Sequence, residues 1–288
     1  MSSAADYSLK GRRAVLATMH GKERVIRPLL EGGLGLDIRL PDAFDTDRFG
    51  TFSREIKRMG SQLDAARQKI IAAFDADPDA EVGIASEGSF GPHPYFFFAA
   101  LGCEIVVMRD RRSGLELMGR HADLRTHFAH VTVQSVDEAV AFADRIGFPA
   151  HGVIVIGTSD SNPAPGAYLR KDILTLEHLS ASVSEAIATC GAAHVETDMR
   201  AHRNPTRMRA IKRATVDLVR TSRSLCPRCA RPGFIVSEKL AGLPCSWCGA
   251  ATNALRAEVS ACTGCQYRCE NPVSLVAADP GSCPSCNP

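Results

Sequence analysis

The chain has 288 residues and a formal net charge of +2, with 45% hydrophobic and 23% charged residues. This balance is ordinary for a folded globular protein, so we expect a packed core in one large domain or two. Residues 1–13 hold no apolar run of signal-peptide length, and the longest apolar run, residues 94–108, is interrupted by Glu104 and too short to cross a bilayer. We therefore expect a cytoplasmic protein with no membrane partner.

Strand-like and helical patterns alternate from residue 11 to about residue 193. The predicted strands are residues 13–18, 36–40, 81–85, 104–108, 115–118, 130–134, 152–156, 169–174 and 194–196. The predicted helices are residues 22–30, 52–74, 94–101, 136–146, 177–189 and 205–221. A parallel crossover needs a covering helix, whereas a hairpin turn at residues 111–114 adds an antiparallel pair. The pattern therefore predicts an α/β fold with a mixed, largely parallel sheet and covering helices.

Polar residues gather in four segments where predicted strands end and helices begin, which is where open α/β sheets bind ligands. In the first segment, Thr18, His20 and Lys22 can hold a phosphate group. The third segment, residues 45–58, offers Arg54 as a further substrate-binding residue. The structural alternatives are a capped turn with a solvated lysine and a charged face exposed to water.

The second segment, residues 85–94, follows a predicted buried strand and is dense in turn-forming residues. Ser86 can bind substrate, Glu87 can bind Mg²⁺ or act as a base, and His93 can act as an acid or base. The structural alternatives are a salt bridge for Glu87 and a helix cap for His93. We expect a functional loop here.

The fourth segment, residues 196–207, has two carboxylates at alternate strand positions, so that both can point the same way toward a divalent metal. These are Glu196 and Asp198, which we predict to be catalytic together with Glu87 and His93. The predicted substrate-binding residues of this segment are Arg200, His202 and Arg207. The alternative is a charged connector.

Taken in order, these segments resemble the inosine-triphosphate pyrophosphatase superfamily, with its Maf-like and non-canonical purine phosphatase branches. Residues 17–22 are similar to its opening ATxNxxK-type turn, except at His20 and Gly21. Residues 65–69 and 86–88 are similar in kind to its KA-type helix motif and acidic glycine-rich loop, and residues 201–203 to its Ser-His-Arg motif. The resemblance covers residues 11 to 205 and implies nucleotide hydrolysis, although the acidic pair of that loop is here a single glutamate.

The last predicted helix starts at Asn204 and Pro205, a good N-cap followed by a residue suited to the first helical position. From Met199 to Arg231 there are ten Arg or Lys residues against one acid, Asp217. Two interpretations stay open. The basic segment contacts nucleic acid or phosphate, or it compensates the negative charge of a metal site built from four thiolates.

Nine of the eleven cysteines lie in the last 63 residues. Eight of them form four Cys-x-x-Cys pairs, each able to present two thiolates from a tight turn: Cys226/Cys229, Cys245/Cys248, Cys262/Cys265 and Cys283/Cys286. Gaps of 15 and 17 residues separate the first pair from the second and the third from the fourth. Since such gaps return a second pair to the same ion, the spacing predicts two structural zinc ribbons in series.

Some features of the tail keep two interpretations. Cys269 replaces one ligand or stays a free thiol, and an iron–sulfur cluster is the alternative to zinc in the second set. The aromatic residues Phe234, Trp247 and Tyr267 stack on bases or form a miniature core. The whole chain also resembles an uncharacterised bacterial domain-of-unknown-function family that joins such a body to cysteine knuckles, and this resemblance implies no activity.

We divide the chain into a flexible N-terminus (1–10), an α/β body (11–198), a connecting basic helix (199–224) and a tandem zinc-ribbon domain (225–288). The leading hypothesis is a hydrolase of a nucleotide or another phosphorylated small molecule, with Mg²⁺ or Mn²⁺ in the body and two structural zinc ions. The alternative is a zinc-ribbon protein that binds nucleic acid or protein on a non-catalytic body. A homodimer is compatible with both.

Overall fold

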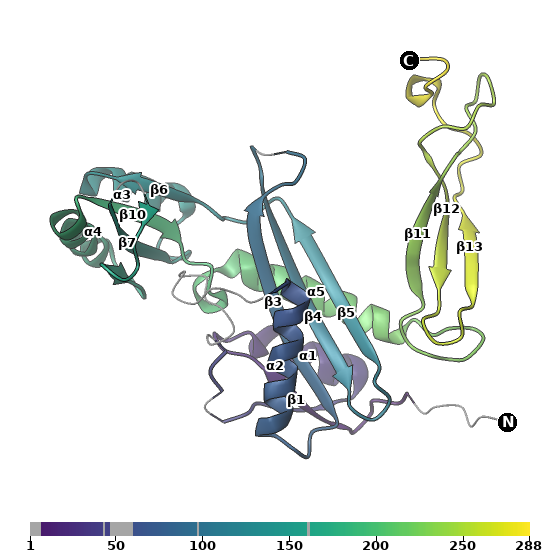
Figure 1. The fold of residues 1–288 in the computed structure, drawn as a ribbon, viewed down its shortest axis with the longest axis horizontal. Coiled ribbons are helices and arrows are strands. Elements are labelled where there is room, and N and C mark those ends of the chain that lie inside the picture. The colour runs from purple at the N-terminus through teal and green to yellow at the C-terminus, as the bar shows by residue number, and fades with distance from the viewer. Residues whose placement is uncertain (1–6, 43, 47–59, 97, 160–161) are drawn as a thin grey trace. The chain divides into compact units, whose positions relative to one another are not determined.

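The computed structural model describes residues 7–42, 44–46, 60–96, 98–159 and 162–288 (Figure 1). The chain divides into two compact units, a body of Leu9–Val219 and a C-terminal unit of Arg220–Pro288 that also includes residues 7 and 8. The predicted site residue Arg54 lies outside the described residues. Among the described helices, none combines the length and the apolar character needed to cross a bilayer.

The first sheet of the body is mixed and has the order β2-β1-β3-β4-β5. Its strands are β1 (Arg13–Ala17), β2 (Asp37–Arg39), β3 (Val82–Pro92), β4 (Ala100–Asp110) and β5 (Glu116–Asp123). Strand β1 runs parallel to β2 and β3, while β3, β4 and β5 are antiparallel neighbours. The α/β class with a mixed sheet is thus confirmed, but the sheet is not largely parallel as expected, because two of its four described ladders are antiparallel.

Helices α1 (Glu23–Leu34) and α2 (Gln62–Ala76) connect the parallel strands of this sheet. The chain moves from β1 outward to β2 and then back across β1 to β3, so right-handed connections place the two helices on opposite faces. Ser61 caps α2 by accepting a hydrogen bond from the backbone of Asp64. The prediction of one continuous helix over residues 52–74 is therefore wrong at residues 60 and 61, and its part over 52–59 lies outside the described residues.

The prediction of a loop after residue 85 and a buried helix over 94–101 is wrong. Strand β3 continues to Pro92 and pairs with β4 as a long hairpin, with Gly88 opposite Glu104. Residues 94–96 and 98–99 form the turn, where Tyr95 and Phe98 are more than four-fifths exposed. Glycine and hydroxyl residues suggested a loop, but here they occupy a strand, because cross-strand packing outweighs their low β-propensity.

The second sheet of the body has the order β6-β10-β7-β8, with β9 also paired to β7. Its strands are β6 (His130–Val133), β7 (Val153–Ser159), β8 (Asn162–Pro163), β9 (Leu169–Arg170) and β10 (Ala192–Thr197). All of its described ladders are antiparallel. Strand β10 lies between β6 and β7 and runs opposite to both, so these two strands do not pair with each other. Helices α3 (Val136–Ile146) and α4 (Leu176–Cys190) pack on it around a core that includes Phe142, Leu179 and Val195.

Helix α5 (Pro205–Arg223) follows a short 3₁₀ turn (Ala201–Arg203), and its predicted cap is confirmed because Asn204 Oδ1 accepts a hydrogen bond from the Arg207 N–H. Within the body, α5 approaches β5 at Gly119. A Cβ atom at this position would overlap the backbone of Ala214 and Leu218, so only glycine permits the approach.

The C-terminal unit is built on a three-stranded antiparallel meander of β11 (Ile235–Ala241), β12 (Leu255–Ala261) and β13 (Arg268–Pro272) (Figure 1). Its order is the chain order, so each strand reverses the direction of the one before it. One Cys-x-x-Cys pair precedes β11, one lies in each connection, and the last follows β13.

Candidate functional site

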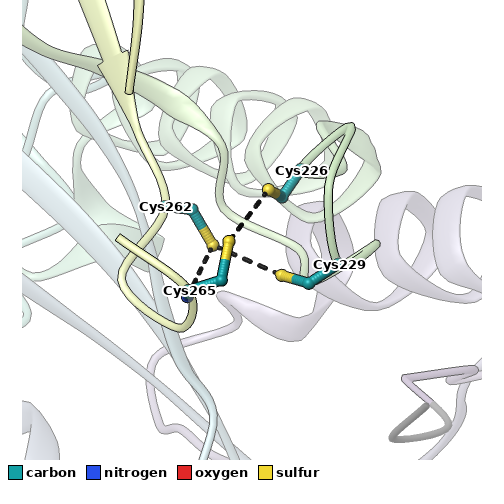
Figure 2. Close-up of side chains that lie close together, drawn as sticks. All are labelled: Cys226, Cys229, Cys262 and Cys265. Atoms are coloured by element: carbon teal, nitrogen blue, oxygen red, sulfur yellow. Dashed lines mark hydrogen bonds between the residues drawn. The ribbon is translucent and has the colours of Figure 1, made fainter. Parts of the chain in front are cut away.

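Figure 2 shows four cysteine side chains that point toward one another, those of Cys226, Cys229, Cys262 and Cys265. The Sγ atoms of Cys226 and Cys265 are 3.7 Å apart, and those of Cys229 and Cys262 are 3.6 Å apart. A tetrahedral zinc ion with Zn–S bonds of about 2.3 Å places its sulfur ligands about 3.8 Å from one another. The sulfur positions therefore fit one zinc ion and are too far apart for disulfides.

The second cluster consists of Cys245, Cys248, Cys283 and Cys286. Its Sγ distances are 3.9 Å between Cys245 and Cys286 and 3.7 Å between Cys248 and Cys283. These distances also fit a single ion, whereas a cluster of several iron atoms holds its cysteine sulfurs further apart. Cys269 belongs to neither cluster, because it lies on β13 with its thiol directed to Asn271.

The pairing of the knuckles corrects the prediction of two ribbons in series. The first pair joins the third, and the second pair joins the fourth. The meander explains this exchange: β11 carries the chain from the first pair to the second, β12 carries it back to the third, and β13 carries it forward to the fourth. The first and third pairs therefore meet at one end of the sheet, and the second and fourth at the other.

Backbone groups of the knuckles favour the thiolate form, which metal binding requires, at one cysteine of each cluster. The N–H groups of Gly264 and Cys265 donate to Cys262 Sγ, and the bond from Cys265 in particular lowers the pKa of Cys262 to about 6. A backbone hydrogen bond from Ser285 likewise lowers the pKa of Cys283 to about 7. With four protein ligands, each site is closed to substrate, so its zinc ion would be structural.

In the body, polar side chains are buried on both faces of β3. On one face, Lys22 Nζ donates to Ser86 Oγ at 3.2 Å, and Arg207 Nε lies 2.7 Å from Glu104 Oε1. Because side chains alternate along a strand, Glu87 points to the other face, which α2 covers. There it forms an ion pair at 2.5 Å with Lys69 of α2.

The electrostatics of this buried polar group centre on Lys22, which is 6% exposed. Burial, followed by repulsion from Arg207 and Lys69, lowers the pKa of Lys22 to about 7, and attraction from Glu87 and Glu104 only partly offsets this. When Lys22 is neutral, the two remaining cations balance the two carboxylates. Gly88 permits the arrangement, because a Cβ there would crowd the Glu104 carboxylate and the Arg207 guanidinium.

One protein family matches residues 69–288, which is well over half of the chain, and it is described as Domain of unknown function (DUF6671). The chain belongs to the DUF6671 family. No curated protein matches it. The resemblance to the inosine-triphosphate pyrophosphatase superfamily therefore stays a prediction. The expected membership of a domain-of-unknown-function family is confirmed. Two four-cysteine clusters in the C-terminal unit accompany it.

In this DUF6671 protein, four predicted site residues lie around β3: Lys22, Ser86, Glu87 and Arg207. The sheet separates Glu87 from the other three. Sequence reasoning did not place their partners Lys69 and Glu104 in the site. A signal existed for Glu104, which is a charged residue inside an apolar run, but not for Lys69, which follows Arg67 and Gln68.

The predicted residues of the fourth segment are engaged elsewhere. Asp198 is fully buried and forms an ion pair with Arg200, which also contacts Asp172. Glu196 lies on the second sheet, 3.5 Å from His194 Nε2. The paired metal ligands expected at Glu196 and Asp198 are thus not what the structure supports, because a guanidinium already occupies the Asp198 carboxylate.

The remaining predicted residues serve local contacts. The rings of His20 and His202 stack at 4.9 Å, and the Thr18 hydroxyl donates to the Met19 carbonyl. His93 Nδ1 accepts hydrogen bonds from the N–H groups of Tyr95 and Phe96, so it caps the turn of the β3–β4 hairpin. Beyond the two cysteine sets, the described part of the body holds no group of three His, Cys, Asp or Glu side chains with the geometry of a metal site, so Mg²⁺ or Mn²⁺ has no support there.

Proposed function

We propose that this protein binds nucleic acid through the exposed basic face of α5, while two structural zinc ions hold the C-terminal unit folded. The observation that carries the proposal is the distribution of charge on α5. The helix buries Ile211, Ala214 and Leu218 completely. The cations that it exposes are Arg209, Lys212, Arg213, Arg220 and Arg223. A concentrated set of exposed cations is the electrostatic feature that phosphate backbones recognise.

The zinc sites support a binding function because they leave no coordination position for a substrate. The predicted catalytic carboxylates support it as well. Glu87 and Asp198 are held in internal ion pairs, Glu87 on β3 of the first sheet and Asp198 directly after β10 of the second. A body of this kind serves as a rigid support for a binding surface.

Fluorescence anisotropy of a labelled single-stranded oligonucleotide with the zinc-loaded full chain tests the proposal. If the five exposed cations of α5 contact phosphates, the logarithm of the association constant falls with the logarithm of salt concentration with a slope of about −3.5. The absence of binding at low salt, or an affinity independent of salt, would contradict the proposal.

Hydrolysis is a second candidate function, and one observation favours it. A lysine with a pKa of about 7 lies within hydrogen-bonding distance of the Ser86 hydroxyl, an arrangement that can activate a serine nucleophile. Ser86 is 1% exposed, so a substrate would need an opening of the body to reach it. Release of phosphate or pyrophosphate from nucleotides that is lost in Ser86→Ala would support this function, and the absence of release would contradict it.

A further inference from the structure

A small basic groove lies in the body between the end of β5 and the first turns of α5. It has a volume of about 110 Å³. The polar and charged residues that line it are His121, Asp123, Arg125, Thr206, Arg209 and Arg213. All of them belong to the body unit, and all are described by the structure.

Helical and strand periodicity together build the groove. Thr206, Arg209 and Arg213 occupy one stripe of α5, because positions three, four and seven residues apart share a face of a helix. Ala210 lies in the same stripe and lines the groove with only a methyl group, which leaves the space open. From β5, His121 and Asp123 point to the same side as Gly119, which α5 approaches.

The charges in the groove are unequal. The Asp123 carboxylate accepts a hydrogen bond from the Arg125 N–H at 2.9 Å and lies 3.3 Å from Arg213 Nη1. The backbone bond, assisted by the charges of Arg125, His121 and Arg213, lowers the pKa of Asp123, so this carboxylate stays ionised at neutral pH. Three guanidiniums against one carboxylate leave a formal excess of two positive charges.

Two further features favour an anion at this place. Thr206 lies in the first turn of α5, where the helix dipole is positive. The Thr206 hydroxyl is also close to two nitrogen atoms, Arg209 Nη2 and His151 Nε2, each at 3.0 Å, which fixes it at the edge of the groove. Arginine forks match the oxygens of a phosphate group better than lysine does.

We propose that this groove binds one phosphate of a nucleic-acid backbone and positions the strand along α5. This inference rests on the proposed nucleic-acid-binding function and names its anchoring site. The volume supports a single phosphate group, because sites for whole small molecules measure roughly 300–1,000 Å³. The remainder of the polymer stays outside the groove, where Lys212 and Arg220 add attraction without close contact.

Two double variants of the zinc-loaded full chain test the inference, each with the same loss of charge from α5. Arg209→Gln with Arg213→Gln empties the groove of two cations, whereas Lys212→Gln with Arg220→Gln removes two cations outside it. We expect the groove variant to weaken oligonucleotide binding by about tenfold or more and to reduce the magnitude of the salt slope by about 1.4, and the control variant to weaken binding by less than about threefold. Unchanged thermal unfolding of both variants confirms that folding is intact.

The other outcomes are distinct. If both double variants weaken oligonucleotide binding equally, the groove is not a specific phosphate site, and binding is due to a diffuse basic surface. If inorganic phosphate binds to the wild type and not to the groove variant, while both bind the oligonucleotide equally well, the site belongs to a small anion and the inference fails. If the wild type binds no oligonucleotide at low salt, the proposed function itself fails.

Discussion

At the scale of single residues, Lys22 is the most informative position. Its ammonium group is buried beside Ser86, and its pKa of about 7 means that the folded protein releases a proton that the unfolded chain keeps. Below pH 7 both states hold the proton, and the cost of burying the charge is present in full. Between pH 7 and about 10 the unfolded chain binds more protons, so the free energy of unfolding rises with pH.

Replacing the lysine with an apolar side chain of similar length tests this account. We expect Lys22→Met to raise the free energy of unfolding of the body at pH 7 by roughly 1–4 kcal/mol, because it removes a poorly solvated charge. The advantage over the wild type should shrink between pH 7 and pH 9, as the wild type becomes neutral. Urea unfolding followed by far-ultraviolet circular dichroism measures it, with exposed Lys212→Met as the control. A variant that is less stable at both pH values contradicts the account.

Single residues also show what sequence can and cannot reveal about the candidate site. Lys22, Ser86 and Arg207 were singled out because the sequence predicted strand ends and helix starts near them, and the structure places their side chains on one face of β3, with Ser86 inside the strand. Glu104, the partner of Arg207, was not singled out. Its position beside this group depends on the register of the β3–β4 hairpin, and local sequence does not specify that register. Asp198 was expected beside a metal ion, yet two residues later in the chain Arg200 supplies its counter-charge.

At the scale of elements, the contact of α5 with β5 decides where the basic face of the helix lies. Gly119 permits the backbone of β5 to approach Ala214 and Leu218, and the residues of the groove follow on the same side of the strand. A side chain at this position would force the helix away from the sheet.

We therefore expect Gly119→Val to lower the free energy of unfolding of the body by at least roughly 1–3 kcal/mol. The matched control is Gly91→Val, also on the first sheet, where a Cβ meets no atom within 4 Å. Circular dichroism at the helix wavelengths reports on the body, because α1 to α4 lie in it. Equal stability of the two variants would show that α5 does not pack closely on β5.

Elements with strong local signals were predicted well. The bounds of α3 agree with the prediction because Ser135 caps its start and Gly147, in the left-handed region, ends it. The aromatic run near residue 95 gave no such signal. Its apolar character indicated a buried helix, whereas the backbone pairing of β3 with β4 places these rings at an exposed hairpin turn.

At the scale of the whole molecule, the two units are stabilised by different means. The body has extensive apolar cores under its two sheets, while the C-terminal unit depends on its cysteine clusters, since strand β11 is almost entirely exposed. The single tryptophan, Trp247, lies in the second knuckle and is 79% exposed, so its fluorescence reports on the C-terminal unit.

The identity of the metal ligands could be predicted from the sequence, but their pairing could not. A gap of 15 residues lets the chain return from the first pair to the second at the same ion. The longer segment from the first pair to the third, which contains two strands, also lets the chain return to the same ion. The choice depends on the direction of β11 and β12, which is a property of the assembled sheet. Only the order of the meander places Cys226 with Cys265 and Cys245 with Cys286.

The interleaved pairing can be tested directly by substituting both zinc ions with cadmium and recording proton–cadmium correlation spectra of the full chain. We expect two cadmium signals. One should correlate with the β-protons of Cys226, Cys229, Cys262 and Cys265, and the other with those of Cys245, Cys248, Cys283 and Cys286. A signal that instead correlates with both Cys226 and Cys245 would show ribbons in series and contradict the fold of the C-terminal unit.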